Sequence, residues 1–180
     1  MNAYIFPTAL LFCSVVFTES AKTKIVAIFH KVLCENQEPK MIAIFNCHVN
    51  LTTSNVSGLY VEFKLAQDVT NVNGLYILAI EHGNKFINYT AQEMNYCEAL
   101  HVIHGQYLTQ MVAVGLRRVS NFPLDCPFKK ELLYYVNGFT IDPKVIPVYM
   151  PRIHFKMTMT FVSNKHQLGS LTTLGQVDRK

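Results

Sequence analysis

The segment IHFKMTMTF, residues 153–161, decides the fold. Every second residue of this segment carries a large apolar side chain: Ile153, Phe155, Met157, Met159 and Phe161. The residues between them are His154, Lys156 and two threonines. Successive side chains of a β-strand point to opposite faces of its sheet. The alternation therefore predicts a strand that has one face in a hydrophobic core and the other toward water.

Other segments predict further strands. Residues 59–65 alternate in the same way, and the apolar face consists of Leu59, Val61, Phe63 and Leu65. Residues 24–32 and 41–50 are β-prone runs on either side of a polar turn, which suits an antiparallel pair. Shorter strands are predicted at residues 131–136 and 168–177.

A β-hairpin is predicted at residues 76–90. The dipeptide Gly83-Asn84 separates two apolar, β-prone arms and fits a two-residue turn. In the second arm we expect Ile87 and Tyr89 to face the interior, and Asn88 to face outward.

Helical periodicity occurs between residues 94 and 119. Apolar residues recur there at spacings of three and four: Tyr96, Leu100, Ile103, Tyr107 and Met111. Thr90 with Glu93 fits a capping box at the start of this helix, and Asn95 is an equally good N-cap. We expect Gly105 to bend or divide the helix. Roughly seven strands with one inserted helical segment predict a mainly β protein, organised as a β-sandwich.

The N-terminal segment predicts secretion. Residues 3–17 are almost entirely apolar, and Thr18-Glu19-Ser20 follows them. This run of about 15 residues is shorter than the roughly 20 that cross a bilayer. We predict a signal peptide at residues 1–20 and a single domain at residues 21–180, with an uncleaved anchor as the alternative. No later apolar stretch approaches membrane length, so we expect a secreted, extracellular protein that does not span the membrane.

The cysteines fit an oxidising compartment. Cys13 lies in the predicted signal peptide, and the other four are Cys34, Cys47, Cys97 and Cys126. Four cysteines allow three pairings, and the sequence does not choose among them. We favour Cys34 with Cys47 across a strand pair, and Cys97 with Cys126 between the helical region and the chain after it. Because the chain has no C-x-x-C pair, a zinc site is the weaker interpretation.

Three N-glycosylation sequons point to the same compartment, and they begin at Asn50, Asn55 and Asn88. Asn50 and Asn55 bracket a polar, turn-like stretch between two apolar segments. A glycan on such a stretch would lie at the surface.

The sequence offers little for catalysis or nucleic-acid binding. The formal net charge of +4 is small and dispersed, and hydrophobic residues at 50% exclude global disorder. No G-x-S-x-G, H-E-x-x-H or phosphate-binding glycine loop is present. His101 and His104 would supply only two metal ligands, and the doublets Arg117-Arg118 and Lys129-Lys130 fit surface charge. We therefore expect no enzyme activity, no metal and no cofactor.

The apolar face of residues 153–161 allows two interpretations. Met157 and Met159 lie between Phe155 and Phe161, and flexible thioethers beside aromatic rings make an adaptable surface that can line a cavity. The same side chains can instead fill a solid core between two sheets, and the pattern alone favours that reading.

The order of several short motifs resembles a large insect family of small secreted proteins. The motifs are Cys34-Glu35, Phe45-Asn46-Cys47, Asn88-Tyr89-Thr90, Tyr96-Cys97-Glu98-Ala99-Leu100, Asp125-Cys126-Pro127-Phe128 and Ile146-Pro147-Val148-Tyr149-Met150-Pro151. That family is a domain of unknown function that is expanded in flies. It is similar in length, cysteine count and strand pattern to the myeloid-differentiation-protein-two-related lipid-recognition (ML) proteins. The resemblance covers residues 32–173.

The resemblance implies an immunoglobulin-like antiparallel β-sandwich whose sheets can separate to admit a lipid, and it implies no catalytic residue. The chain has no Trp, the core residue of a true immunoglobulin domain. We expect a secreted protein that binds a lipid or other hydrophobic small molecule. The side chains expected to face this ligand are Phe63, Leu65, Phe155, Met157, Met159 and Phe161. The alternative is an extracellular protein-interaction factor that has a solid sandwich core and binds a receptor.

Overall fold

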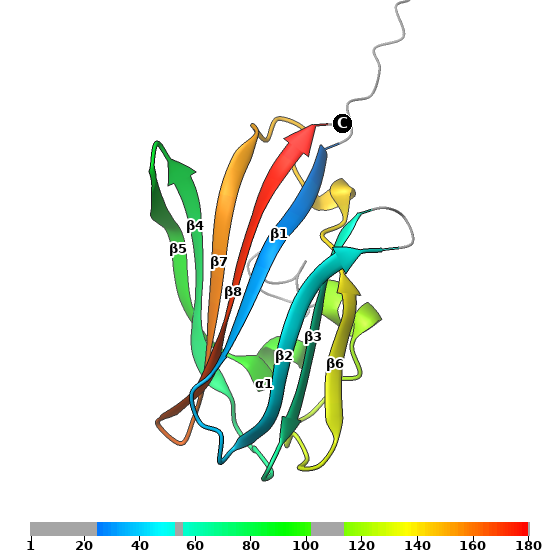
Figure 1. The fold of residues 1–180 in the computed structure, drawn as a ribbon, viewed down its shortest axis with the longest axis vertical. Helices are drawn as coiled ribbons and strands as arrows, with labels where there is room; N and C mark the ends of the chain where they lie inside the picture. The colour runs from blue at the N-terminus through cyan, green and yellow to red at the C-terminus, as the bar shows by residue number, and fades with distance from the viewer. Residues whose placement is uncertain (1–24, 53–55, 102–113, 180) are drawn as a thin grey trace, which may run out of the picture.

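The computed structural model describes residues 25–52, 56–101 and 114–179 and contains two antiparallel β-sheets that face each other (Figure 1). The five-stranded sheet has the strand order β1-β8-β7-β4-β5, and the three-stranded sheet has the order β2-β3-β6. The predicted mainly β, antiparallel sandwich is confirmed, with eight strands in the described ranges where roughly seven were expected. The predicted signal peptide lies outside the described residues.

The elements lie in the following order along the chain. Their bounds are β1 (Ile25–Asn36), β2 (Ile42–Leu51), β3 (Ser57–Leu65), β4 (Asn73–His82), β5 (Lys85–Asn95), α1 (Tyr96–His101), β6 (Leu133–Phe139), η1 (Pro143–Val145), β7 (Ile153–Ser163) and β8 (His166–Arg179). Residues 114–119 are also helical.

Two tight hairpins build the five-stranded sheet. The predicted turn at Gly83-Asn84 joins β4 to β5, and Gly83 has a positive φ of 63°, which glycine adopts without steric cost. Asn164 and Lys165 join β7 to β8, and both have positive φ, at 50° and 67°. A two-residue turn of this left-handed kind matches the twist of the strands that it connects.

The expected antiparallel pairing of the first two strands is wrong. β1 pairs with β8 and β2 pairs with β3, so the two strands belong to different sheets. Residues 37–41 carry the chain from one sheet to the other, and Gln37 N and Glu38 N both donate to Leu168 O near the start of β8. Strand-forming patterns identify a strand but not its partner, so a crossing between sheets looks the same as a hairpin in the sequence.

The expected burial of Ile87 and Tyr89 is also wrong. Ile87 is 56% exposed and Tyr89 is 69% exposed. β5 is the terminal strand of its sheet, and the pairing register shifts between Leu78 and Ala79, opposite this part of β5. Such a bulge breaks the alternation of faces. Asn88, the third sequon residue, is exposed as expected.

The helical segment begins later than its periodicity indicated. β5 continues through Asn95, so the capping box of Thr90 and Glu93 is wrong, and both residues lie in a strand. The N-cap of α1 is Asn95, whose side-chain oxygen accepts hydrogen bonds from Cys97 N at 3.0 Å and Glu98 N at 3.3 Å. Gly105 lies outside the described residues.

Both favoured disulfides are present, but the first one has a different role from the one expected. Cys34 and Cys47 lie on the facing sides of the two sheets, on the terminal strands β1 and β2, with a Cα–Cα distance of 5.9 Å. This disulfide therefore joins the two sheets at one edge of the sandwich. Cys97 in α1 is bonded to Cys126, with a Cα–Cα distance of 5.8 Å.

Removal of the disulfide between the sheets should destabilise the fold without unfolding either sheet locally. For the double variant Cys34→Ala/Cys47→Ala, we expect the free energy of unfolding to fall by about 3 kcal/mol, the chain-entropy value for a closed loop of about 15 residues. Urea unfolding of the variant and of the wild type measures this loss. An unchanged free energy of unfolding would show that the sheets do not depend on this link.

Candidate functional site

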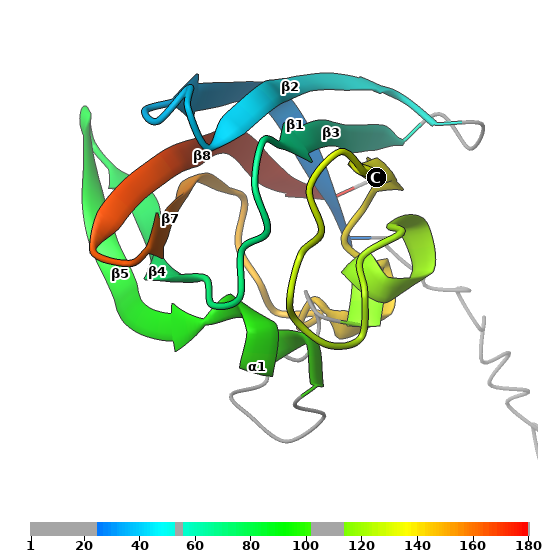
Figure 2. The ribbon, with the colours of Figure 1, turned by 90° about the horizontal axis from the view of Figure 1, so that it is seen from below.

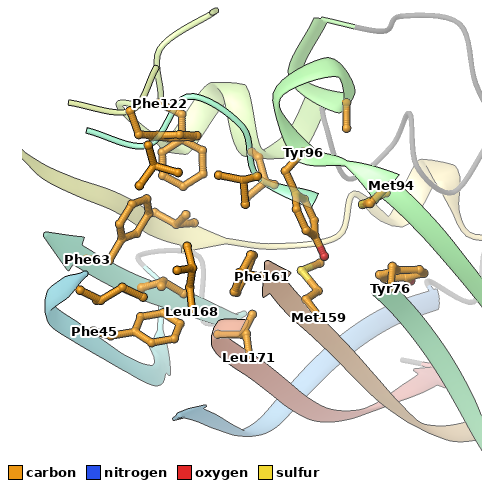
Figure 3. Close-up of a pocket in the computed structure, with 18 of the residues that line it drawn as sticks. Phe45, Phe63, Tyr76, Met94, Tyr96, Phe122, Met159, Phe161, Leu168 and Leu171 are labelled. Carbon is orange, nitrogen blue, oxygen red and sulfur yellow. The ribbon is translucent and has the colours of Figure 1, made fainter. Parts of the chain in front are cut away.

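An apolar cavity of about 200 Å³ lies between the two sheets (Figure 3). It is larger than the roughly 150 Å³ apolar cavities that stay dry and admit benzene or xenon. In Figure 2, β2 and β3 lie on one side of the molecule and α1 lies across from them. Both sheets, α1 and several connecting segments contribute residues to its lining.

The three-stranded sheet supplies one wall. All four apolar residues of β3 that the alternation singled out line the cavity: Leu59, Val61, Phe63 and Leu65. The Phe63 ring is the centre of an aromatic cluster, with ring-centroid distances of 5.7 Å to Phe122, 5.9 Å to Phe128 and 5.2 Å to Tyr134. Phe63 and Leu65, two of the expected ligand contacts, thus line the cavity.

The five-stranded sheet supplies the opposite wall through Met157, Met159 and Phe161 of β7, together with Leu171 of β8. Phe155 was also expected to face the ligand, but it does not line the cavity. Its ring packs edge-on against Phe29 at a centroid distance of 6.3 Å, and its side chain is only 6% exposed. One face of β7 is thus divided between a cavity wall and a solid core.

Segments outside the sheets also border the cavity. Val69 and Phe128 exchange two backbone hydrogen bonds of 2.9 Å and bring the chain after β3 against the chain before β6. Asp68 strengthens this contact between the two connections by accepting hydrogen bonds from Lys130 N at 2.8 Å and from Lys129 Nζ at 3.1 Å. These two donors, the Lys130 N–H first, lower the pKa of the Asp68 carboxyl. The predicted basic doublet at 129–130 therefore holds this connection in place.

Further lining residues were not proposed from the sequence. They come from β2, β4, β5, β6, α1, β8 and the connections: Ile42, Phe45, Val69, Val72, Tyr76, Met94, Tyr96, Ala99, Leu116, Phe122, Phe128, Val136, Phe139 and Leu168. α1 is held against this side of the cavity by the disulfide from Cys97 to Cys126. Among these residues, Tyr96 belongs to the apolar positions that recur at helical spacing, so the sequence did indicate that its side chain faces the interior.

Tyr76 and Tyr96 carry the only polar side-chain atoms among the described lining residues. Burial raises the pKa of Tyr76 above its ordinary value of 10.0. Burial also raises the pKa of Tyr96, and the charge that an ionised Tyr76 would carry adds to this effect. Both phenols are therefore neutral at physiological pH.

The other expected chemical groups do not gather at the cavity. Asn50 and Asn88 are exposed at the surface, and Asn55 lies outside the described residues, as does His104. Arg117 and Arg118 are exposed. Within the described ranges, no group of three or more His, Cys, Asp or Glu residues could hold a metal ion. No helix in those ranges is long and apolar enough to cross a bilayer.

Residues 71–157 match the model of a family described as "Protein of unknown function (DUF1091)". This match confirms the predicted resemblance to a domain of unknown function. It extends from the residues before β4 to the middle of β7 and so includes Tyr76, Tyr96 and both cysteines of the second disulfide. No curated protein matches the chain.

Since one part of β7 faces a packed core and another part faces the cavity, the same Phe→Ala substitution should lower the free energy of unfolding by different amounts in the two parts. Phe155→Ala removes a ring from a packed core and should lower the free energy of unfolding by about 3–5 kcal/mol. Phe161→Ala removes a ring that already borders empty space, so we expect its cost to be smaller by about 1 kcal/mol or more. Urea unfolding compares the two variants, and equal losses would indicate that the space beside Phe161 is filled.

The raised phenol pKa values predict a loss of stability at alkaline pH. Since the folded state disfavours the phenolates, the stabilising contribution is fully present below pH 10.0 and is lost as the pH rises above it. Between about pH 9 and about pH 11, the free energy of unfolding should fall less steeply for Tyr96→Phe than for the wild type. Urea unfolding at each pH measures this, with the exposed Tyr149→Phe as the control; parallel slopes for Tyr96→Phe and the wild type would contradict the prediction.

Proposed function

We propose that the protein is a secreted binding protein that holds a lipid or other hydrophobic small molecule between its two β-sheets and performs no catalysis. The observation that supports this most directly is the cavity itself, which is lined by hydrocarbon, aromatic and thioether side chains from both sheets. A solid sandwich would have no such space. The proposed ligand contacts are Phe63, Leu65, Met157, Met159 and Phe161.

The energetics of such a site do not require a charged anchor. Each buried methylene group of a guest contributes about 0.8 kcal/mol, so a ten-carbon tail would supply roughly 8 kcal/mol before association and ordering costs. Methionines at two positions of β7 let the wall adapt to guests of different shape. Affinity can therefore come from hydrocarbon burial alone.

Secretion is part of the same proposal. All four cysteines after residue 20 are paired, which suits an oxidising compartment. The exposed asparagines Asn50 and Asn88 are accessible to a glycan, and the apolar segment at residues 3–17 fits a signal peptide. The resemblance to ML proteins, and through them to lipid recognition, supports this reading, as does the resemblance to a fly-expanded insect family.

A second candidate function is an extracellular interaction factor that binds a receptor. The observation that favours it is the connection after η1, where Val148 and Tyr149 are 84% and 80% exposed. Met150 N donates to Pro147 O at 2.9 Å, so a turn presents these two side chains. The two candidates differ in whether the space between the sheets is occupied.

A cavity-filling substitution tests the proposal. Ala99 lies on α1 and lines the cavity, so the ring of Ala99→Phe would occupy the volume of a guest. We expect this variant to bind a fluorescent hydrophobic probe, N-phenyl-1-naphthylamine, at least about tenfold more weakly, equivalent to about 1.4 kcal/mol. The matched control is Ala91→Phe, which places the same ring at an exposed position of β5 and should leave binding unchanged.

Native mass spectrometry of the protein from a secreting host adds a second measurement, because a retained guest would appear as added mass. Wild-type protein that neither retains a guest nor binds the probe would refute the proposed function. Equal binding by Ala99→Phe and the wild type would place the probe outside the cavity and would refute the site.

A further inference from the structure

The two hydroxyl groups in the cavity are distributed unevenly. Tyr76 and Tyr96 lie toward one end, beside Met94, whereas Phe63 and Phe122 lie toward the other (Figure 3). The phenol end is formed by β4 and by the junction of β5 with α1. A molecule that fills the cavity would therefore meet hydrogen-bonding groups at one end and hydrocarbon at the other.

The Tyr96 side chain is held firmly in position. Its backbone N–H donates to Val72 O at 2.7 Å, and its ring packs on Phe161 at a centroid distance of 5.1 Å. Gly74 makes this placement possible, because a Cβ atom there would lie 2.8 Å from the Tyr96 ring and 1.8 Å from Thr160 O. The hydroxyl thus has a fixed location before any ligand arrives.

That hydroxyl has no hydrogen-bond partner among the described residues, although its oxygen is buried. A buried hydroxyl without a partner loses its hydrogen bonds to water, which is unfavourable. Phenylalanine at position 96 would fill the same space without this cost, and the chain uses phenylalanine at six other lining positions. The hydroxyl is therefore unfavourable in the empty cavity and becomes favourable when a guest pairs with it.

The charge of the guest follows from the rest of the lining. No described lining residue is Lys, Arg or His, so a carboxylate or phosphate would enter an apolar space without a cation to pair with it. Burial of an unpaired anion is far more costly than burial of a neutral polar group. A neutral oxygen, as in an alcohol, ester or ketone, can accept a hydrogen bond from the Tyr96 hydroxyl at no such cost.

We propose that the cavity selects a neutral, singly oxygenated hydrocarbon whose oxygen accepts a hydrogen bond from the Tyr96 hydroxyl, with its chain extending toward Phe63 and Phe122. This inference rests on the proposed function and specifies its ligand class. It predicts discrimination against two molecules of the same chain length: an alkane, which leaves the hydroxyl without a partner, and a fatty-acid anion, which lacks a counter-charge.

The test compares 1-decanol, decane and decanoate as competitors of N-phenyl-1-naphthylamine at neutral pH, each supplied from a cyclodextrin complex. We expect wild-type protein to bind 1-decanol more tightly than either of the others. Tyr96→Phe should weaken 1-decanol binding about 3- to 10-fold, the range for one hydrogen bond, and leave decane binding unchanged. The matched control Tyr149→Phe, at an exposed position, should alter neither.

Thermal unfolding of the ligand-free protein provides an independent readout. Because the substitution removes a buried hydroxyl without a partner, Tyr96→Phe should unfold at the wild-type temperature or above it. A lower temperature would mean that the hydroxyl has a partner inside the protein, and it would overturn the inference.

The outcomes separate the two proposals. If the wild type binds neither the probe nor any competitor, both proposals fail. If it binds 1-decanol and decane equally, or if Tyr96→Phe weakens both to the same extent, hydrocarbon binding stands and the role of Tyr96 is refuted. Preferential binding of decanoate would refute the exclusion of anions.

Discussion

The fold depends on how the two sheets are held together along one side. β1 is the strand of the five-stranded sheet that approaches β2 and β3 most closely, and the disulfide from Cys34 to Cys47 links the two terminal strands there. Away from this edge, buried side chains of the two sheets pack in one core, which includes Val136, Phe155 and Leu171, and the connections and α1 border the remaining space. A sandwich that is clamped at one edge can leave space between its sheets without losing any backbone hydrogen bond of either sheet.

The sequence determines the strands well because burial of one face imposes a period of two. The apolar sides of residues 59–65 and 153–161 point inward as expected. In the β4–β5 hairpin, the predicted turn and the predicted exposure of Asn88 are both correct. Which strands pair with each other is harder to derive, because the patterns of β1 and β2 suit a hairpin as well as a crossing between sheets. A cystine is compatible with both arrangements, so correct pairing of Cys34 with Cys47 did not reveal that it spans the sheets.

The cavity could be derived only in part. Phe155 and Phe161 are equivalent in the alternation of β7, yet one packs on Phe29 and the other borders the cavity. This difference depends on what lies opposite, which a local pattern does not contain. Phe122 and Phe128 come from irregular segments with no periodicity to mark them, and they are placed by contacts such as the exchange of hydrogen bonds between Val69 and Phe128.

The terminal position of β5 has a consequence for self-association. A terminal strand presents a row of peptide groups to which another sheet can add, and exposed apolar side chains at Phe86, Ile87 and Tyr89 make such addition more favourable. Asn88 lies in the middle of this stretch, so a carbohydrate attached to it would stand where an incoming strand has to align. Protein without a carbohydrate at Asn88 would lack this steric obstacle, and its tendency to form intermolecular sheets would rise with concentration.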